Sequence, residues 1–70
     1  MKRSNLFMIR AELGLLQIKM AKKLRIAQSS YSMIENRKSR PSIDVVKRLM
    51  VIIKNKRLHY DIDDIMNQYK

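Results

Sequence analysis

Residues 17–36, QIKMAKKLRIAQSSYSMIEN, contain the pattern that decides the fold. Apolar residues recur at helical spacing in each half of this stretch, namely Ile18, Ala21 and Leu24 in the first half and Tyr31 and Ile34 in the second. This spacing predicts two short amphipathic helices joined by a turn. Because Ala21 is small, the second helix can cross the first closely.

The second of these helices has a polar face opposite its apolar one. The polar face consists of short hydrogen-bond donors and acceptors and one flexible apolar side chain, namely Gln28, Ser29, Ser32, Met33 and Asn36. It carries no charge until Glu35 at its edge. Amides and hydroxyls bond to base edges in the major groove of DNA, and an apolar side chain suits a thymine methyl. The polar face therefore favours base contacts, which we predict for Gln28, Ser29, Ser32 and Met33.

Several short motifs around this stretch follow one order and spacing. They are Gly14 to Gln17, Ala21, Ile26 to Ser32, Ile34-Glu35-Asn36 and Pro41-Ser42. Together they resemble the phage-repressor and Cro-type (lambda-repressor-like) helix-turn-helix family from about residue 10 to residue 53. The resemblance implies an all-α domain of five helices, with the helix-turn-helix at the second and third. It also implies sequence-specific binding of double-stranded DNA.

Three positions depart from the pattern of that family. Leu16 stands where a Ser or Thr usually caps the helix, and it has no oxygen with which to do so. Arg25 and Arg37 stand where the family prefers Gly in a left-handed conformation, which costs a non-Gly residue about 1 kcal/mol. Both arginines add positive charge near the expected DNA backbone. Each is equally well explained as a surface arginine tolerated in a turn.

The resemblance also implies a group of residues that contact DNA phosphates. They are Gln17, Asn36, Arg37, Lys38 and Arg40, with Arg10, Lys2 and Arg3 as further candidates. Gln17 opens a helix, where its amide and the exposed backbone N–H groups can both donate to a phosphate. Lys38 and Arg40 follow the second helix of the motif, although a run of charges is often only a solvated face. Lys2 and Arg3 are either a DNA-binding arm or a solvated tail.

Length and charge agree with this interpretation on separate grounds. Seventy residues allow one domain, 1–70, with its core in residues 5–53. Sixteen Lys and Arg against six Asp and Glu give a net charge of +10, which favours a polyanion such as nucleic acid or an anionic membrane. Residues 1–57 hold 15 basic and 3 acidic side chains, whereas residues 58–70 hold 1 and 3. The two parts are therefore expected to have different roles.

The composition also excludes several kinds of site. The chain has no cysteine, which rules out disulfides, thiolate metal sites and thiol nucleophiles. It has no nucleophile–base–orienter set and no phosphate-binding glycine loop, so we expect no enzyme activity and no cofactor. His59 beside Asp61, Asp63 and Asp64 resembles a metal site, but helix capping and the helix dipole explain the carboxylates better. No apolar run suits a membrane span or a signal peptide, and we expect a cytoplasmic, nucleoid-associated protein.

The flanking segments predict three further helices. Ser4 or Asn5 can cap a first helix that ends at Gly14, and Ser42 can cap a fourth. Asp61 and Asp64 form a capping-box pattern at the start of a last helix, about residues 61–69. Its apolar positions, with Leu58 before it, predict a homodimer interface of Leu58, Ile62, Ile65, Met66 and Tyr69. The same stripe could instead close the core of its own chain.

Function is predicted from these features as transcriptional regulation of a bacterial, plasmid or phage operon, with repression the first choice. The expected partner is a double-stranded DNA operator with two-fold symmetry, bound by a homodimer, and any small-molecule effector is unknown from the sequence. An antitoxin or a restriction-system controller would use the same domain. An alternative of another class is a basic module that docks on an acidic protein or a membrane. Such a module would concentrate its basic residues on one amphipathic helix, whereas here they are spread over four segments.

Overall fold

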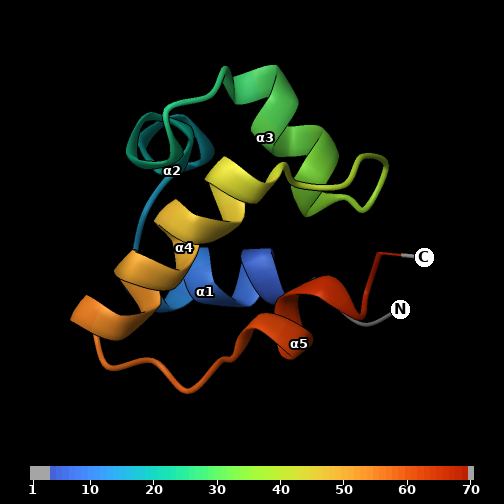
Figure 1. Cartoon of the computed structure of the whole chain (residues 1–70). Helices are drawn as coiled ribbons and strands as arrows, with labels where there is room; N and C mark the ends of the chain where they lie inside the picture. The colour runs from blue at the N-terminus through green and yellow to red at the C-terminus, as the bar shows by residue number, and fades with distance from the viewer. Residues whose placement is uncertain (1–3, 70) are drawn as a thin grey trace.

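The computed structural model describes residues 4–69, which form five helices and no strand. Their bounds are Asn5–Leu13 for α1, Gln17–Leu24 for α2, Gln28–Glu35 for α3, Ile43–Asn55 for α4 and Ile62–Met66 for α5. Figure 1 shows α2 and α3 at one end of the molecule and α1 and α5 at the other, with α4 running between them. The predicted all-α, five-helix fold is confirmed.

Local sequence signals set the ends of the longer helices. Ser4 caps α1 by accepting from the Phe7 N–H at 3.1 Å, and Ser42 caps α4 by accepting from the Val45 N–H at 3.3 Å. Gly14 ends α1 at φ 66°, a left-handed conformation that a side chain would strain. These ends agree with the sequence-based expectations.

The last helix is shorter than the sequence pattern predicts. Asp61 and Asp64 form the expected capping box, with each side chain accepting from the other residue's backbone N–H. The helix stops at Met66, however, and residues 67 and 68 form a turn. Tyr69 therefore follows α5 instead of lying on it.

The core draws side chains from all five helices. Its buried apolar residues are Leu6, Ile9, Met20, Ala21, Leu24, Tyr31, Ile34, Val45, Leu49, Ile53, Ile65 and Tyr69. One member of the predicted apolar stripe lies outside the core, because Ile18 is 45% exposed and Met20 occupies the inner side of α2 instead. The inner side of α2 faces both α3 and α4, so its apolar stripe follows residues 20, 21 and 24. Arg48 of α4 also donates to the Leu24 carbonyl at 3.2 Å.

Two residues of the predicted dimer interface belong to this core. Ile65 is completely buried and Tyr69 is 6% exposed in the single chain. A second copy cannot contact either side chain unless the fold opens. Leu58 and Met66 are partly buried against the core, whereas Ile62 is 47% exposed. Of the five predicted residues, Ile62 offers the largest free apolar surface.

An ion pair joins α1 to the end of α3. Arg10 donates from Nε and Nη2 to the two carboxylate oxygens of Glu35, each at 2.9 Å, and from Nη1 to the Leu15 carbonyl at 2.9 Å. Both side chains are largely withdrawn from water, with 16% and 4% exposure. Burial acts to raise the pKa of Glu35, but hydrogen bonds from Arg10 and Tyr31 and the positive charge of Arg10 lower it overall. Glu35 is therefore held as a carboxylate at neutral pH.

This ion pair predicts a specific loss of stability in acid. A group whose pKa is lower in the folded chain adds stability above its unfolded pKa, and that stability is lost as pH falls through the folded pKa. The urea-unfolding free energy of the wild type should therefore fall as the pH drops below about 5, and Glu35→Gln should show a smaller fall. Equal pH dependence in the wild type and in Glu35→Gln would contradict this role for Glu35.

Candidate nucleic-acid interface

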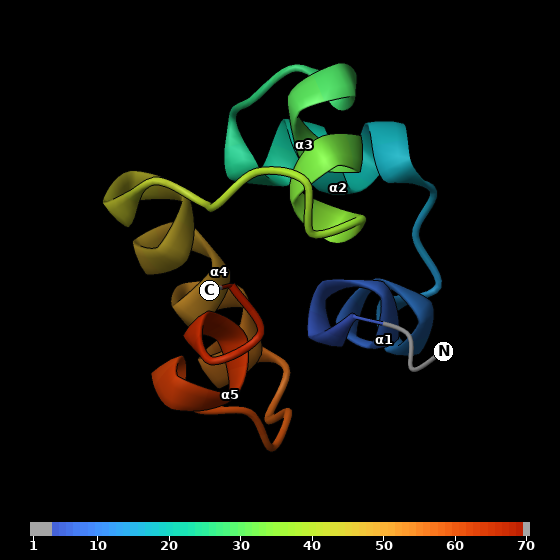
Figure 2. The same ribbon diagram turned by 90° about the vertical axis from the view of Figure 1, so that its right-hand side faces the viewer.

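A tight turn fixes α3 against α2. Arg25 ends α2 at φ 60°, the left-handed conformation expected from the sequence, and the Ile26 N–H donates to the Ala21 carbonyl at 3.0 Å. Ala27 returns to an extended conformation and α3 begins at Gln28. Figure 2 shows the result, in which α3 crosses in front of α2. One side of α3 is thereby packed inward and the other faces solvent.

The two sides of α3 differ in chemistry as the sequence predicts. Tyr31, Ile34 and Glu35 are buried, whereas Gln28, Ser29 and Met33 are exposed. Ser32 is partly buried, and its hydroxyl accepts from the Asn36 side-chain amide at 3.3 Å. The polar face is thus mostly accessible, although two of its members bond to each other.

Charge is distributed unevenly around α3. Its only carboxylate, Glu35, is turned inward against Arg10, so the exposed face from Gln28 to Met33 has no ionised side chain. Tyr31 packs beside the pair. Burial is the main cause that raises the pKa of its hydroxyl, and the neighbouring Glu35 carboxylate raises this pKa further. An acid-free polar surface results, and it does not repel a polyanion.

The N-termini of α2 and α3 lack side-chain caps. Leu16 and Ala27 precede these helices and provide no side-chain oxygen for the first N–H groups, whereas Ser4, Ser42 and Asp61 do so for α1, α4 and α5. Gln17, the first residue of α2, is partly buried, and a hydrogen bond from its side chain helps to lower the pKa of Glu35. Uncapped N–H groups at a helix start are suitable donors for a phosphate.

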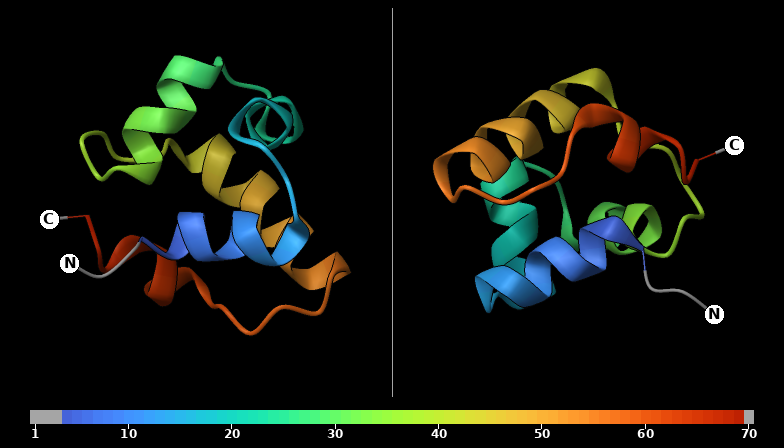
Figure 3. Two further views of the ribbon diagram at one scale, coloured as in Figure 1. Left: turned by 180° about the vertical axis from the view of Figure 1, so that it is seen from behind. Right: turned by 90° about the horizontal axis from the view of Figure 1, so that it is seen from below.

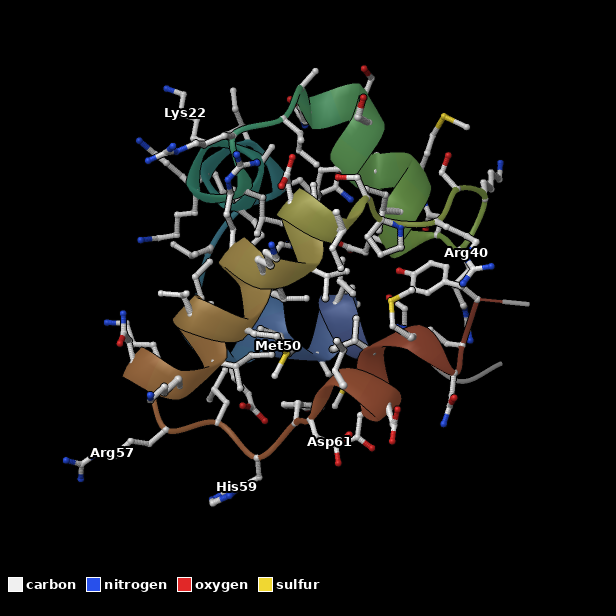
Figure 4. All side chains as sticks on the ribbon, in the orientation of Figure 1. Lys22, Arg40, Met50, Arg57, His59 and Asp61 are labelled. Atoms are coloured by element: carbon white, nitrogen blue, oxygen red, sulfur yellow. The ribbon has the colours of Figure 1, made fainter. Side chains whose placement is uncertain are left out.

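A basic loop, residues 37–40, follows α3. Arg37 adopts φ 63°, the second left-handed arginine that the sequence predicts. The backbone N–H groups of Lys38 and Ser39 both donate to the Met33 carbonyl, at 2.8 and 3.2 Å. Lys38 and Arg40 are exposed, and Figure 4 shows Arg40 projecting from this loop on the side of the molecule away from Lys22 of α2. The loop therefore places cations beside the polar face of α3.

The predicted phosphate contacts also include Arg10, Lys2 and Arg3. Arg10 has three nitrogens engaged with Glu35 and Leu15, so the structure makes it a link within the fold instead of a free surface cation. Lys2 and Arg3 lie outside the described residues.

A hollow beside α3 was not anticipated from the sequence. It lies between α3, the loop and α4, and its lining is Ile26, Ser30, Met33, Ile34, Ser39, Arg40, Ser42 and Val45. Ser30 is exposed on α3, yet its spacing gave no signal, because the hollow is formed by segments that meet only in the fold. Two helices, α3 and α4, together with the α2–α3 turn and the loop, thus contribute to the surface around the predicted base contacts.

Other kinds of site find less support in the structure. Within residues 4–69, no three His, Cys, Asp or Glu side chains gather so that they could hold a metal ion. His59 and Arg57 project from the connection between α4 and α5, away from α3 (Figure 4). None of the helices in the described part of the chain is long and apolar enough to cross a membrane.

Comparison with known proteins identifies the family. A helix-turn-helix family model matches residues 6–58, a span that runs from the second residue of α1 through α4 and ends before α5. No curated protein and no solved structure matches the chain. The matched span is well over half of the chain, and α2, its turn and α3 lie inside it. The protein therefore belongs to the helix-turn-helix family, in its lambda-repressor and Cro-like form.

Proposed function

We propose that this protein regulates transcription by binding a specific double-stranded DNA sequence, and that it acts as a repressor. Membership of the family supports DNA binding. Repression is the simplest consequence of an all-helical domain that occupies an operator. The protein would act in the cytoplasm, on the nucleoid.

The observation that carries this proposal is the charge distribution of α3. A helix that enters the major groove presents donors and acceptors to the base edges, and an exposed carboxylate close to the phosphates would be repelled by them. Gln28 and Ser29 supply such groups, Met33 supplies an apolar contact, and Glu35 is withdrawn into the ion pair with Arg10. We assign the base contacts to Gln28, Ser29, Ser32 and Met33.

The phosphate contacts surround this face. We assign them to Gln17 at the start of α2 and to Asn36, Arg37, Lys38 and Arg40 after α3. Arg10 acts differently, because its guanidinium fixes Glu35 and so orients α3. An antitoxin or a restriction-system controller would make the same DNA contacts, and would differ in the partner or promoter that it serves.

Selection of fragments from a random DNA pool by the pure protein tests this function. Two helices of this kind read half-sites one turn of DNA apart, about 34 Å, so the enriched sequences should share a two-fold symmetric consensus. Enrichment of no sequence above background would reject specific DNA recognition and favour a basic docking module.

Gln28→Ala tests whether the polar face reads bases. A good bidentate amide contact with a base contributes about 1–3 kcal/mol of discrimination, so affinity for the selected site should fall by about ten- to a hundredfold. Affinity for random DNA should hardly change, because phosphate contacts supply nonspecific binding. The two affinities are measured by fluorescence anisotropy, and an equal loss on both DNAs would remove Gln28 from the base contacts.

Lys38→Ala tests the phosphate contacts. Loss of one phosphate contact should lower the slope of log K against log salt by about 0.9, and it should weaken binding to all sequences alike. Lys54 is the matched control, since it is exposed at the end of α4 that lies far from α3 in Figure 1. Lys54→Ala should keep the wild-type slope. If the two variants show the same slope, Lys38 is not a phosphate contact.

Homodimerisation is part of the proposal, because one domain contacts too few base pairs to select a single binding site in a genome. Residues 58–70 hold 1 basic and 3 acidic side chains, so two copies meeting there avoid the repulsion of the strongly basic remainder. Ile62 is the exposed apolar residue of this segment, and Leu58 and Met66 flank it at partial burial. We propose that a second copy of the chain contacts these three residues.

Ile62→Asp tests this contact. The side chain is exposed, so the variant should unfold in urea like the wild type, whereas the loss of a buried Ile contact should weaken operator binding by about tenfold or more. Val51→Asp on α4 is the control, because Val51 is 58% exposed and outside the proposed contact. Binding is measured on the symmetric site and on a half-site, and sedimentation of the protein with the symmetric site reports whether two copies are bound. Identical behaviour of Ile62→Asp and Val51→Asp would contradict the contact at Ile62.

A further inference from the structure

Residues 59–69 lie outside the span that matches the family, yet they return to the helix proposed to contact DNA. Figure 1 and both views of Figure 3 show the stretch after α5 on the same side of the molecule as the loop between α3 and α4. Tyr69 makes the closest connection. Its side chain is 6% exposed, and its hydroxyl donates to the Ile34 carbonyl at 2.7 Å.

The position of this hydrogen bond matters because Ile34 lies in the last turn of α3. The same Ile34 carbonyl accepts from the Arg37 N–H at 3.1 Å, where the chain leaves the helix for the basic loop. Burial raises the pKa of Tyr69 to about 12, so the hydroxyl is protonated at neutral pH and remains a donor. Tyr69 therefore donates to the same carbonyl that accepts from the first residue of the basic loop.

Tyr69 also lies directly against that loop. Together with Arg37, Lys38, Ser39 and Arg40 it lines a small hollow beside the end of α3. The N–H groups of Lys38 and Ser39 also hold the loop, by donating to the Met33 carbonyl. A rigid aromatic ring beneath such a short loop restricts the directions in which the loop can relax.

The segment that carries Tyr69 is itself anchored to α1. The backbone N–H of Asn5 donates to Gln68 Oε1 at 3.0 Å, and the Asn5 side-chain amide donates to the Asp64 carbonyl. The Tyr69 N–H in turn donates to the Met66 carbonyl at 3.0 Å. These bonds hold the backbone on both sides of residue 68, so the Tyr69 ring has a fixed origin from which to contact the loop.

We propose that Tyr69 is a positioning residue for DNA binding, which fixes the basic loop to the last turn of α3 so that Lys38 and Arg40 face the phosphates together. This inference rests on the proposed function for its consequence on DNA, but the restraint on the loop exists without DNA. The grip on the DNA backbone then depends on a segment outside the family span. A ligand that withdrew Tyr69 from the loop would weaken DNA binding, and by linkage DNA would strengthen the docking of residues 59–69.

Tyr69→Phe tests this role, because it keeps the ring and removes only the hydroxyl. The matched control is Tyr60→Phe in the same segment, since Tyr60 is partly buried near Glu12 and Asp64 instead of α3. Amide hydrogen exchange is measured without DNA at Lys38 and Ser39 in the loop and at Leu49 in the core of α4. In Tyr69→Phe the loop amides should exchange about two- to tenfold faster, the range expected for one lost hydrogen bond, and by a larger factor than Leu49. In Tyr60→Phe they should not.

DNA binding provides the second measurement. At temperatures where both variants are folded, Tyr69→Phe should bind selected and random DNA about two- to tenfold more weakly. Its slope of log K against log salt should also be reduced, by up to about 0.9. Tyr60→Phe should keep the wild-type slope. A purely structural Tyr69 would lower the unfolding free energy yet leave the slope of the folded protein unchanged, and that result would overturn the proposal. Unchanged loop exchange would overturn it as well. If the wild type binds no DNA, the proposed function fails, and the exchange measurement still decides whether Tyr69 restrains the loop.

Discussion

The Arg10–Glu35 pair is the interaction on which the rest of the structure depends. It ties α1 to the end of α3 through two 2.9 Å hydrogen bonds, and a third bond from Arg10 holds the Leu15 carbonyl just before α2. The pair is partly buried, so removing either partner leaves the other charge poorly solvated and without its counter-charge, which destabilises the fold. The same pair removes the only carboxylate of α3 from the surface. A single contact thus orients the helix proposed to bind DNA and makes its exposed face compatible with a polyanion.

The local structure around α3 departs from the most stable choices, and the departures favour anions. Arg25 and Arg37, which flank α3, adopt φ 60° and 63°, where glycine would avoid a strain of about 1 kcal/mol. Leu16 and Ala27 leave the starts of α2 and α3 without side-chain caps. The core and the ion pair must offset these costs. Positive side chains and open N–H groups are what a phosphate backbone requires, so we interpret these departures as a stability cost accepted for binding. Arg57, at φ 55° after α4, has the same strain without this explanation.

Sequence reasoning predicted features that neighbouring residues determine and missed those that depend on distant ones. The caps at Ser4 and Ser42, the Asp61–Asp64 capping box and the left-handed Arg25 and Arg37 each follow from a few adjacent residues, and all are present. Arg10 was predicted to contact a phosphate. Its partner in the structure, Glu35, is 25 residues away, so the sequence around Arg10 did not indicate the ion pair. Ile18 belongs to the predicted apolar stripe but is exposed in the structure. A short stripe does not reveal that both α3 and α4 pack on α2, and this packing selects which side of α2 is buried. Tyr69 was predicted at a dimer surface. Its hydroxyl instead bonds to the Ile34 carbonyl, 35 residues earlier, a contact that its neighbours in the sequence do not indicate.

The burial of two predicted interface residues, Ile65 and Tyr69, changes how two copies would assemble on DNA. An amphipathic pattern shows that an apolar face must be covered, but not by what, and the single chain already buries Ile65 and Tyr69. A contact limited to Ile62 and its half-buried neighbours is small, and small interfaces form weak complexes in solution. A weak contact can still be effective, because two copies on adjacent half-sites meet at an effective concentration that reaches the millimolar range. We infer that the operator assembles the pair, so that occupancy rises steeply with protein concentration while the free protein is mainly monomeric.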